Sequence, residues 1–352
     1  MQTDAKVLVI ITPGFSKSEA DSSCLPFAQN LVLSFNRNFP EIKIIILSFQ
    51  YPFTSTEYSW NGNRVIPLGG KDRGKLARRL IWIRAWQKLK RIKRENNIIG
   101  LLSFWCGECA FIGNRFSKKY GITHRCWVLG QDAKEENKYI KKVHPLPEEL
   151  IAVSDFVADE FFKNFLIRPQ HIVPNGIDKN LFDSNTVERS IDIMGAGSLI
   201  PLKQYEILVH CIGELKKNLP HISAIIAGKG RECRVLQELI MRLDLEDNVK
   251  LVGEKEHGEV LKLMQQTKVF LHPSLYEGFS MVCQEALYAG CHVISFCKPM
   301  NVDFKHWHIV KTKDEMVTKA LEILSQVGLD YNAVTTYSID ETAKSFMNLY
   351  ID

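Results

Sequence analysis

Short apolar runs recur along the whole chain, and longer mixed segments separate them. In the first half the runs occupy residues 7–11, 42–49, 98–104, 126–129 and 150–153, and in the second half 191–194, 224–227, 249–252, 269–271 and 293–296. Strands that are buried on both faces read as near-continuous apolar runs, and helix-length spacers between them are typical of parallel sheets covered by helices. The pattern therefore predicts two successive α/β units.

The join between the two units is expected in the turn-rich span 174–190, which has little apolar periodicity. Its Pro174-Asn175-Gly176 sequence favours a tight turn with Asn or Gly at positive φ. Near the end of the chain, residues 337–342 are typical of a helix start that leads into residues 343–350.

The segment 273–286 combines a turn with the start of a helix. It places Glu277 and Glu285 eight residues apart, on either side of a Gly-Phe-Ser turn. A turn that runs into a helix presents free backbone N–H groups, and the helix dipole favours negative charge there. This layout suits a ligand with an anionic centre and hydroxyl groups at both ends, such as a nucleotide-sugar. The alternative is an ordinary loop and helix with two solvated glutamates.

This arrangement resembles the E-x(7)-E signature of retaining GT-B glycosyltransferases, particularly glycosyltransferase family 4. The resemblance implies two Rossmann-like domains facing each other across a cleft, with residues 1–182 as the N-terminal acceptor-side domain and 183–336 as the nucleotide-sugar-binding domain. It also implies that the final helix, within 337–352, crosses back to the N-terminal domain. A second family marker is the run 174–178, which closes the N-terminal domain in that family.

The resemblance assigns donor-binding roles along the chain. Glu277 would contact the transferred sugar, Glu285 would hold the ribose hydroxyls, and Lys203 would meet the diphosphate, with Glu277 and Lys203 as the catalytic pair. The other residues that it implies on the donor are Gly14, Ser198, Gly228, Gly253, Lys255, Gly278, Phe279, Ser280 and Met281.

The chain departs from the family pattern at three positions. Ser198 stands where an arginine is common, and Gly14 is the only glycine of a loop that usually has two. Gln131 occupies the place of a histidine that faces the sugar in many members. A glutamine can hydrogen-bond a sugar but does not titrate near neutral pH. Whether Gln131 replaces the histidine in function stays open at this point.

The expected reaction chemistry uses no metal, because no D-x-D sequence stands at a strand end. Lys203 and the helix N-terminus would then stabilise the leaving nucleoside diphosphate. Glu277 is interpreted as a clamp for sugar hydroxyls, because retention in this family does not require a covalent carboxylate intermediate. No cofactor is expected beyond the co-substrate, a UDP- or GDP-sugar.

Composition supports an ordinary globular protein. The 352-residue chain is 45% hydrophobic and 24% charged, without a secretory-signal pattern or an apolar run near the ~20 residues that span a bilayer. The nine cysteines are scattered, which favours reduced thiols in the cytoplasm over a disulfide framework. The Cys106–Cys109 spacing lacks the second pair of a zinc ribbon, and Leu76 replaces the hydroxyl residue in a sequence that otherwise resembles a phosphate-binding P-loop.

Positive charge is concentrated in one segment. Residues 71–94 hold eleven Lys or Arg and one acid, so the segment carries 11 − 1 = +10 while the rest of the chain carries 5 − 10 = −5. With Trp82 and Trp86, the segment is either a solvated helix or a surface for anionic lipid or an acceptor, and a nucleic-acid role is disfavoured. Its apolar residues are expected to pack partly on the sheet.

The sequence thus predicts a cytoplasmic retaining glycosyltransferase that moves a sugar from a nucleotide-diphosphate donor to a glycan or lipid-linked acceptor in cell-surface polysaccharide synthesis. Peripheral contact with the inner membrane face through residues 71–94 is part of this expectation. The alternative is a non-catalytic GT-B scaffold or partner subunit that binds nucleotide-sugar.

Overall fold

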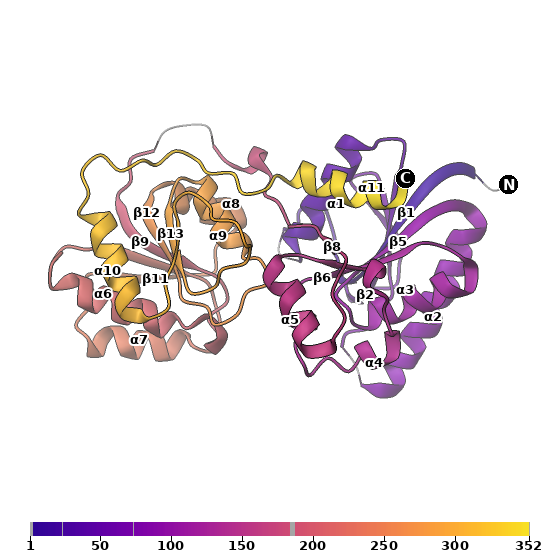
Figure 1. Ribbon diagram of the computed structural model, residues 1–352, viewed down its shortest axis with the longest axis horizontal. Coiled ribbons are helices and arrows are strands. Elements are labelled where there is room, and N and C mark those ends of the chain that lie inside the picture. Colours follow the sequence, from indigo (N-terminus) through magenta and orange to yellow (C-terminus); the bar gives the residue numbers. More distant parts are fainter. Residues whose placement is uncertain (1–2, 23, 73, 184–186, 352) are drawn as a thin grey trace. The chain divides into compact units, whose positions relative to one another are not determined.

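The chain forms two compact α/β units (Figure 1). The computed structural model describes residues 3–22, 24–72, 74–183 and 187–351, so Arg73 and the part of the predicted join at 184–186 lie outside it. The first unit comprises Met1–Gly176 and Ile339–Asp352, and the second Ile177–Ser338. The junctions expected from the sequence stood at 182/183 and 336/337.

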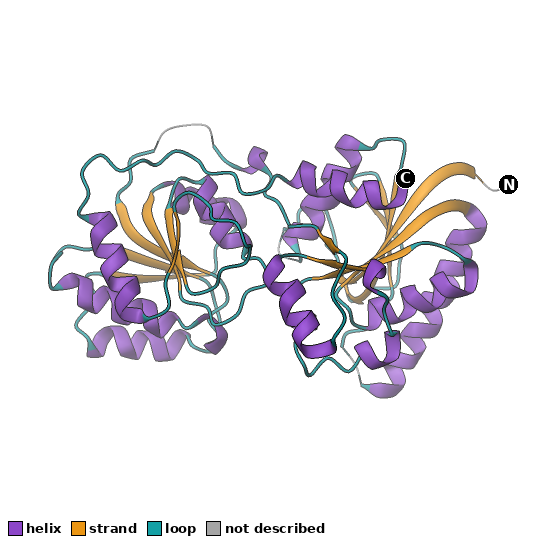
Figure 2. Cartoon of the chain, viewed as in Figure 1, coloured by secondary structure: helices purple, strands orange, loops and turns teal. Residues whose placement is uncertain are grey.

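The first unit is built on an eight-stranded sheet with the order β3-β4-β2-β1-β5-β6-β7-β8, parallel except for the β3–β4 pair (Figure 2). Val7 to Ile11 in the central strand have no exposed surface, because helices cover both faces. The strands are β1 (Thr3–Gly14), β2 (Lys43–Tyr51), β3 (Tyr58–Trp60), β4 (Asn63–Pro67), β5 (Asn96–Phe104), β6 (His124–Val128), β7 (Leu150–Ala152) and β8 (His171–Ile172).

Helices cover the two faces of this sheet unequally. Figure 1 shows α1 (Pro26–Asn38) and α11 (Ile339–Ile351) on one face, and α2 (Lys75–Glu95), α3 (Glu108–Tyr120), α4 (Ile140–Val143) and α5 (Asp155–Phe165) on the other. Right-handed crossovers require this division of the helices that connect strands, because the chain runs outward in one direction from β1 to β2 and then in the other direction from β5 to β8.

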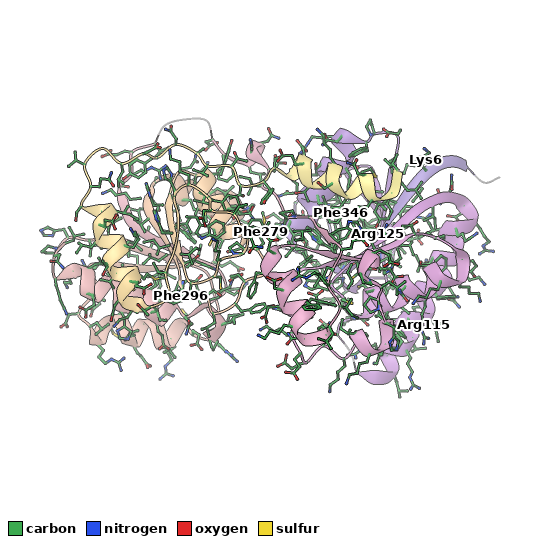
Figure 3. All side chains as sticks on the ribbon, viewed as in Figure 1. Lys6, Arg115, Arg125, Phe279, Phe296 and Phe346 are labelled. Atoms are coloured by element: carbon green, nitrogen blue, oxygen red, sulfur yellow. The ribbon has the colours of Figure 1, made fainter. Side chains whose placement is uncertain are left out.

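The last helix belongs to the first unit, as predicted. Asp340 accepts hydrogen bonds from Ser34 at 2.6 Å and Arg37 at 3.0 Å on α1, and the Tyr350 hydroxyl donates to the Leu101 carbonyl at 2.9 Å. Phe346 is fully buried against Trp127, with ring centroids 4.8 Å apart (Figure 3). The predicted return of the C-terminal helix is therefore confirmed.

The Pro174–Asp178 run lies at the junction of the units, but its backbone differs from the expected turn. Neither Asn175 nor Gly176 adopts a positive φ. Instead, the Gly176 N–H donates to the Thr342 hydroxyl at 3.0 Å, and that hydroxyl donates to the Pro174 carbonyl at 2.8 Å. The returning helix satisfies the polar groups that a tight turn would otherwise pair within itself.

The second unit has a six-stranded parallel sheet with the order β11-β10-β9-β12-β13-β14. Its strands are β9 (Ile191–Ala196), β10 (Ala224–Ala227), β11 (Val249–Gly253), β12 (Thr267–His272), β13 (His292–Ser295) and β14 (Trp307–Ile309). Its helices are α6 (Tyr205–Lys216), α7 (Cys233–Arg242), α8 (His257–Gln265), α9 (Met281–Tyr288) and α10 (Lys313–Leu324). Every apolar run that predicts a strand overlaps one of the strands in the two sheets.

Across the described ranges, no helix is both long enough and apolar enough to cross a lipid bilayer.

Candidate functional site

The strand order of the second sheet reverses between β9 and β12. The chain moves outward from β9 to β10 and β11, and then returns to the other side of β9 with β12 and β13. In open α/β sheets, ligands bind beyond the carboxyl ends of the strands at such a switch point. The loop after β9 contains Lys203, and the loop after β12 contains Glu277, so both candidate catalytic residues flank this point.

Three side chains meet at the switch point. The Lys203 ammonium, from the 3₁₀ turn η4 (Pro201–Lys203), forms an ion pair with Glu277 Oε1. The same oxygen lies 2.9 Å from Nε2 of His272, the last residue of β12. His272 is 2% exposed, and Ser280 Oγ lies 3.4 Å from its Nε2. A carboxylate only accepts hydrogen bonds, so both partners donate to Glu277.

The electrostatics of this cluster favour an ionised Glu277. Burial alone would raise the pKa of its carboxyl group, but the hydrogen bond from His272 and the positive charge of Lys203 lower that pKa to about 2. The carboxylate therefore stays charged throughout the physiological pH range and keeps lone pairs for ligand hydroxyl groups.

Glu285 has a histidine partner of its own. It lies on the second turn of α9, and its Oε1 is 2.8 Å from Nε2 of His257, the first residue of α8. The hydrogen bond to Glu285 raises the pKa of His257 above its ordinary value despite partial burial. The two glutamates of the motif are therefore each held by one histidine.

The N-terminus of α9 lies between the two glutamates in sequence. Ser280 occupies the position before the helix, and Met281 is its first residue, so their amides belong to the group that has no partner within the helix. The Phe279 ring, labelled in Figure 3, is buried. It stacks on Trp307 at a centroid distance of 6.2 Å and lies edge-on to Tyr337 at 5.8 Å. Only the backbone of Phe279 is therefore suited to meet a ligand.

Two glycine loops pack directly against each other beside Lys203. A Cβ atom on Gly228 would overlap the carbonyl oxygen of Gly197, and both residues have φ values near the limit of the left-handed region, 147° and 143°. The Gly228 N–H also donates to the Gly253 carbonyl at 2.8 Å. Gly228 thus fixes the spacing of three loops at the carboxyl edge of the sheet.

The remaining predicted donor-binding residues of this unit lie on the same edge. Ser198 is exposed in the loop after β9, and Gly253 ends β11 with a φ of 72°. Lys255 follows in the next loop, with its Nζ 4.0 Å from Glu259. Gly278 lies in the turn between Glu277 and α9.

Two residues of the site, His272 and His257, were not predicted from the sequence. Each is paired to a motif glutamate by tertiary contact, and neither is part of the E-x(7)-E spacing. A signal for His272 was present: a histidine at the end of an apolar strand run, five residues before a candidate catalytic carboxylate.

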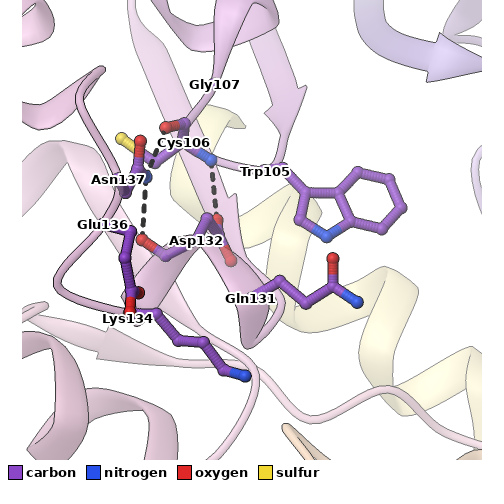
Figure 4. A pocket seen from close by; sticks show the side chains of 8 residues that line it. All are labelled: Trp105, Cys106, Gly107, Gln131, Asp132, Lys134, Glu136 and Asn137. Carbon is purple, nitrogen blue, oxygen red and sulfur yellow. Dashed lines mark hydrogen bonds between the residues drawn. The ribbon is translucent and has the colours of Figure 1, made fainter.

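The first unit contains a cavity at the carboxyl ends of β5 and β6 (Figure 4). The cavity has a volume of about 430 Å³ and includes Gln131 and Trp105 in its lining. Gln131 begins the 3₁₀ turn η1 (Gln131–Ala133), and its side chain points away from the buried Asp132. Gly14 ends β1 in the same unit. The remaining lining residues are Cys106, Gly107, Asp132, Lys134, Glu136 and Asn137.

Asp132 anchors the loops around this cavity. Its carboxyl group accepts backbone hydrogen bonds from Cys106 at 2.7 Å, and from Leu129 and Gly130 at 3.0 Å each. Burial raises the pKa of Asp132 to about 6, although these N–H groups oppose the rise.

In the ranges that the structure describes, no group of three or more His, Cys, Asp or Glu side chains is arranged to hold a metal ion.

The family match of this chain lies almost entirely in the second unit. Residues 176–325 match the family model for glycosyl transferases group 1. A phosphatidylinositol N-acetylglucosaminyltransferase component from Homo sapiens is 34% identical over 126 residues, which cover 35% of this chain and 26% of the human protein. The GtfA component of the UDP-N-acetylglucosamine–peptide N-acetylglucosaminyltransferase from Streptococcus pneumoniae is 29% identical over 147 residues, or 42% of this chain and 29% of GtfA. The matched part of the chain thus spans less than a third of either relative.

Solved structures resemble both units together. HepE from Anabaena, in complex with UDP and glucose, has a TM-score of 0.66 at 16% identity and covers 98% of this chain and 95% of its own. Sucrose-phosphate synthase from Thermosynechococcus elongatus has a TM-score of 0.70 at 15% identity, with 98% and 94% covered. At these identities the likeness concerns the fold, which is GT-B as predicted. The chain therefore has the GT-B fold, and its residues 176–325 are similar to the glycosyl transferases group 1.

Proposed function

We propose that this protein is a retaining glycosyltransferase that moves a sugar from a nucleoside-diphosphate donor, a UDP- or GDP-sugar, to a glycan or lipid-linked acceptor of cell-surface polysaccharide synthesis. The observation that carries the proposal is the Lys203–Glu277–His272 cluster at the switch point of the second sheet, beside the N-terminus of α9. HepE, which shares the fold, was solved with UDP and glucose, and a pneumococcal O-GlcNAc transferase with UDP and GlcNAc.

Lys203 and the first amides of α9 hold the diphosphate in this proposal. A lysine ammonium has three donors, so Lys203 can keep its bond to Glu277 and still donate to a phosphate oxygen. As the donor bond breaks, negative charge grows on the leaving diphosphate, and these fixed groups stabilise it without a metal ion.

The two motif glutamates bind opposite ends of the donor. Glu277, kept ionised by Lys203 and His272, accepts hydrogen bonds from the hydroxyls of the transferred sugar. Glu285 accepts those of the ribose, with His257 fixing its carboxylate. The loops that contain Gly228, Gly253 and Lys255 lie along the base and ribose side. Ser198, at the position of the common arginine, lies on the diphosphate side, and Gly14 is the donor-binding residue expected in the first unit.

Gln131 contacts the sugar in place of the histidine of many relatives. It lines the cavity of the first unit together with Trp105, whose ring offers an apolar face to a sugar. Gln131 donates and accepts hydrogen bonds but transfers no proton near neutral pH. We also propose a reducing, cytoplasmic setting, which the nine free thiols support.

A donor panel tests this proposal. Thermal unfolding is followed with UDP, GDP and ADP, because a ligand at ~100 times its dissociation constant adds about 2.7 kcal/mol of apparent stability. Release of nucleoside diphosphate from matching donor sugars is then measured for the native chain and for Glu277→Gln. Binding with release that Glu277→Gln abolishes supports the enzyme, and release that is unchanged in the variant contradicts the assigned site.

A second candidate is a non-catalytic GT-B scaffold or partner subunit that binds nucleotide-sugar. Two observations favour it: the exposed Ser198 at the common arginine position, and Gln131 at the histidine position. Nucleotide binding without any donor turnover, in the presence of acceptor glycans, would support this candidate over the enzyme.

A further inference from the structure

The outer face of α2 carries side chains that the fold does not use. The inner face packs on the sheet through four fully or largely buried residues: Ile81, Ala85, Leu89 and Ile92. Trp82 and Trp86 pack on α3, with ring centroids 4.9 Å from Phe111 and 5.2 Å from Phe116. The expectation that the apolar residues of this segment pack partly on the sheet is therefore confirmed.

Three aliphatic side chains of α2 are left in water. Leu76, Leu80 and Ile83 are 79%, 57% and 54% exposed. Their spacing of four and three residues places them in one row along the helix. A contiguous apolar row of this kind on a surface marks an interaction site.

The surface is hollowed next to this row. An open groove of about 720 Å³ lies between α2 and α3, and its apolar lining consists of Trp82, Ile83, Trp86, Phe111 and Ile112. This volume is in the range of cavities that accept small apolar ligands.

Positive charge surrounds the same surface. Arg79, Lys90 and Arg115 line the groove, and Arg84 is exposed one turn beyond Leu80. Within the described residues, Arg79, Arg84 and Lys90 form no ion pair.

Two other cations of α2 are already engaged within the unit. Lys88 donates to Glu57 at 2.7 Å, and Arg91 donates to Glu95 at 2.7 Å. These two residues stabilise the fold locally, so they are unsuited to test what the outer face binds.

We infer that the outer face of α2, together with the α2–α3 groove, docks the first unit on an anionic lipid bilayer. The aliphatic row enters the boundary between headgroups and acyl chains, and the cations meet lipid phosphates. A nucleic acid would pair with the cations but would leave Leu76, Leu80 and Ile83 in water. This inference goes beyond the proposed sugar transfer and does not depend on it.

Vesicle co-sedimentation of the full chain tests the charge component. Vesicles of equal parts phosphatidylcholine and phosphatidylglycerol are compared with vesicles of phosphatidylcholine alone, at low and high salt. Each basic residue near an anionic leaflet contributes a factor of about five, so Arg79→Gln, Arg84→Gln and Lys90→Gln together should lower the partition coefficient roughly a hundredfold. The matched control removes three exposed cations of the second unit, with Arg242→Gln, Lys250→Gln and Lys311→Gln.

A second variant tests the apolar component. Leu80→Ser with Ile83→Ser should weaken binding at both salt concentrations, whereas Val235→Ser with Met241→Ser, exposed on α7, should not. Circular dichroism checks that all variants keep their fold. The inference is overturned if the native chain ignores anionic vesicles at low salt, if the control variants lose as much binding as the α2 variants, or if single-stranded RNA binds this face while vesicles do not.

Discussion

Glu277, whose side chain is 15% exposed, and the buried Asp132 are carboxylates in comparable places. Each lies in the loop that follows a parallel strand, Glu277 after β12 in the second unit and Asp132 after β6 in the first. Their surroundings differ: Glu277 faces the side chains of Lys203 and His272, whereas Asp132 accepts three backbone N–H groups. The pKa of Glu277 is lowered to about 2, and burial raises that of Asp132 to about 6.

The difference shows that neighbouring groups, and not burial alone, determine the pKa of a carboxyl group. Burial favours the neutral form of both groups, and backbone dipoles only partly offset it at Asp132. At Glu277 the side-chain hydrogen bond from His272 and the positive charge of Lys203 together reverse the effect of burial on the pKa. Glu277 is thereby suited to bind ligand hydroxyls as an anion, while Asp132 joins the loops that form the cavity of the first unit.

Removing the cation should have the largest effect. We expect Lys203→Ala to lower the transfer rate by about 10²–10³, because one fixed stabiliser of the developing charge is lost. Nucleoside diphosphate binding should weaken by ~1.5–3 kcal/mol, and nucleoside monophosphate binding far less. Calorimetry with both nucleotides measures this. Lys229→Ala, an exposed lysine paired with Glu254 in a neighbouring loop, is the control. Equal losses for both nucleotides would remove Lys203 from the diphosphate site.

The free energy of unfolding at acid pH should depend on Glu277. Its pKa is lower in the folded chain, so the ionised group stabilises the native state above about pH 4.5, and this contribution is lost as the pH falls toward 2. The shift corresponds to about 3 kcal/mol. Glu277→Gln should be less stable than the native chain at pH 7 by about this amount, and the two should converge near pH 2. Urea unfolding across this range measures it, and a constant difference would contradict the assigned ionisation.

Asp132 should change the pH dependence of the free energy of unfolding in the opposite direction. Its folded pKa of about 6 lies above the ordinary value of 3.8, so the native state binds the proton more tightly and loses stability as the pH rises from about 3.8 to 6. The loss is on the order of 3 kcal/mol. Asp132→Asn should remove this decline, and the exposed Asp247→Asn should not. A carboxyl ¹³C signal of Asp132 that titrates below pH 4 would refute the comparison.

The sequence predicted elements whose pattern is local. The apolar runs located ten strands, and the Glu277–Glu285 spacing located the turn and helix at the switch point. The β3–β4 hairpin was missed although Asn61-Gly62 supplies its signal, with φ values of 44° and 78° at the two turn residues.

Features that arise from distant segments could not be read in the same way. His257 reaches Glu285 from another helix, and no spacing along the chain records that pair. The exposure of Leu80 and Ile83 depends on which face of α2 meets the sheet, and the broad apolar face of the helix left this choice open. The donor-binding roles inferred from the family resemblance stay predictions.

His272 should affect transfer less than Lys203, because His272 contacts Glu277 and is not assigned to the diphosphate. We expect His272→Ala to raise the pKa of Glu277, so that the acid limb begins at higher pH, and to weaken donor binding roughly tenfold. His272→Gln, whose amide can also donate, should restore part of both. If the alanine variant lowers activity without moving the acid limb, His272 acts through packing alone.

Chelation of divalent metal ions should not change the transfer activity. In the proposed reaction, Lys203 and the amides at the N-terminus of α9 stabilise the leaving diphosphate, which is the role that a divalent ion takes in metal-dependent transferases. Activity should therefore be the same in excess EDTA and in added manganese or magnesium, at every donor concentration. The Lys203→Ala variant sharpens the test, because a metal ion could then substitute for the missing charge and restore part of the rate. Activity of the native chain that disappears with EDTA and returns with manganese or magnesium would show that the Lys203–Glu277 pair does not suffice.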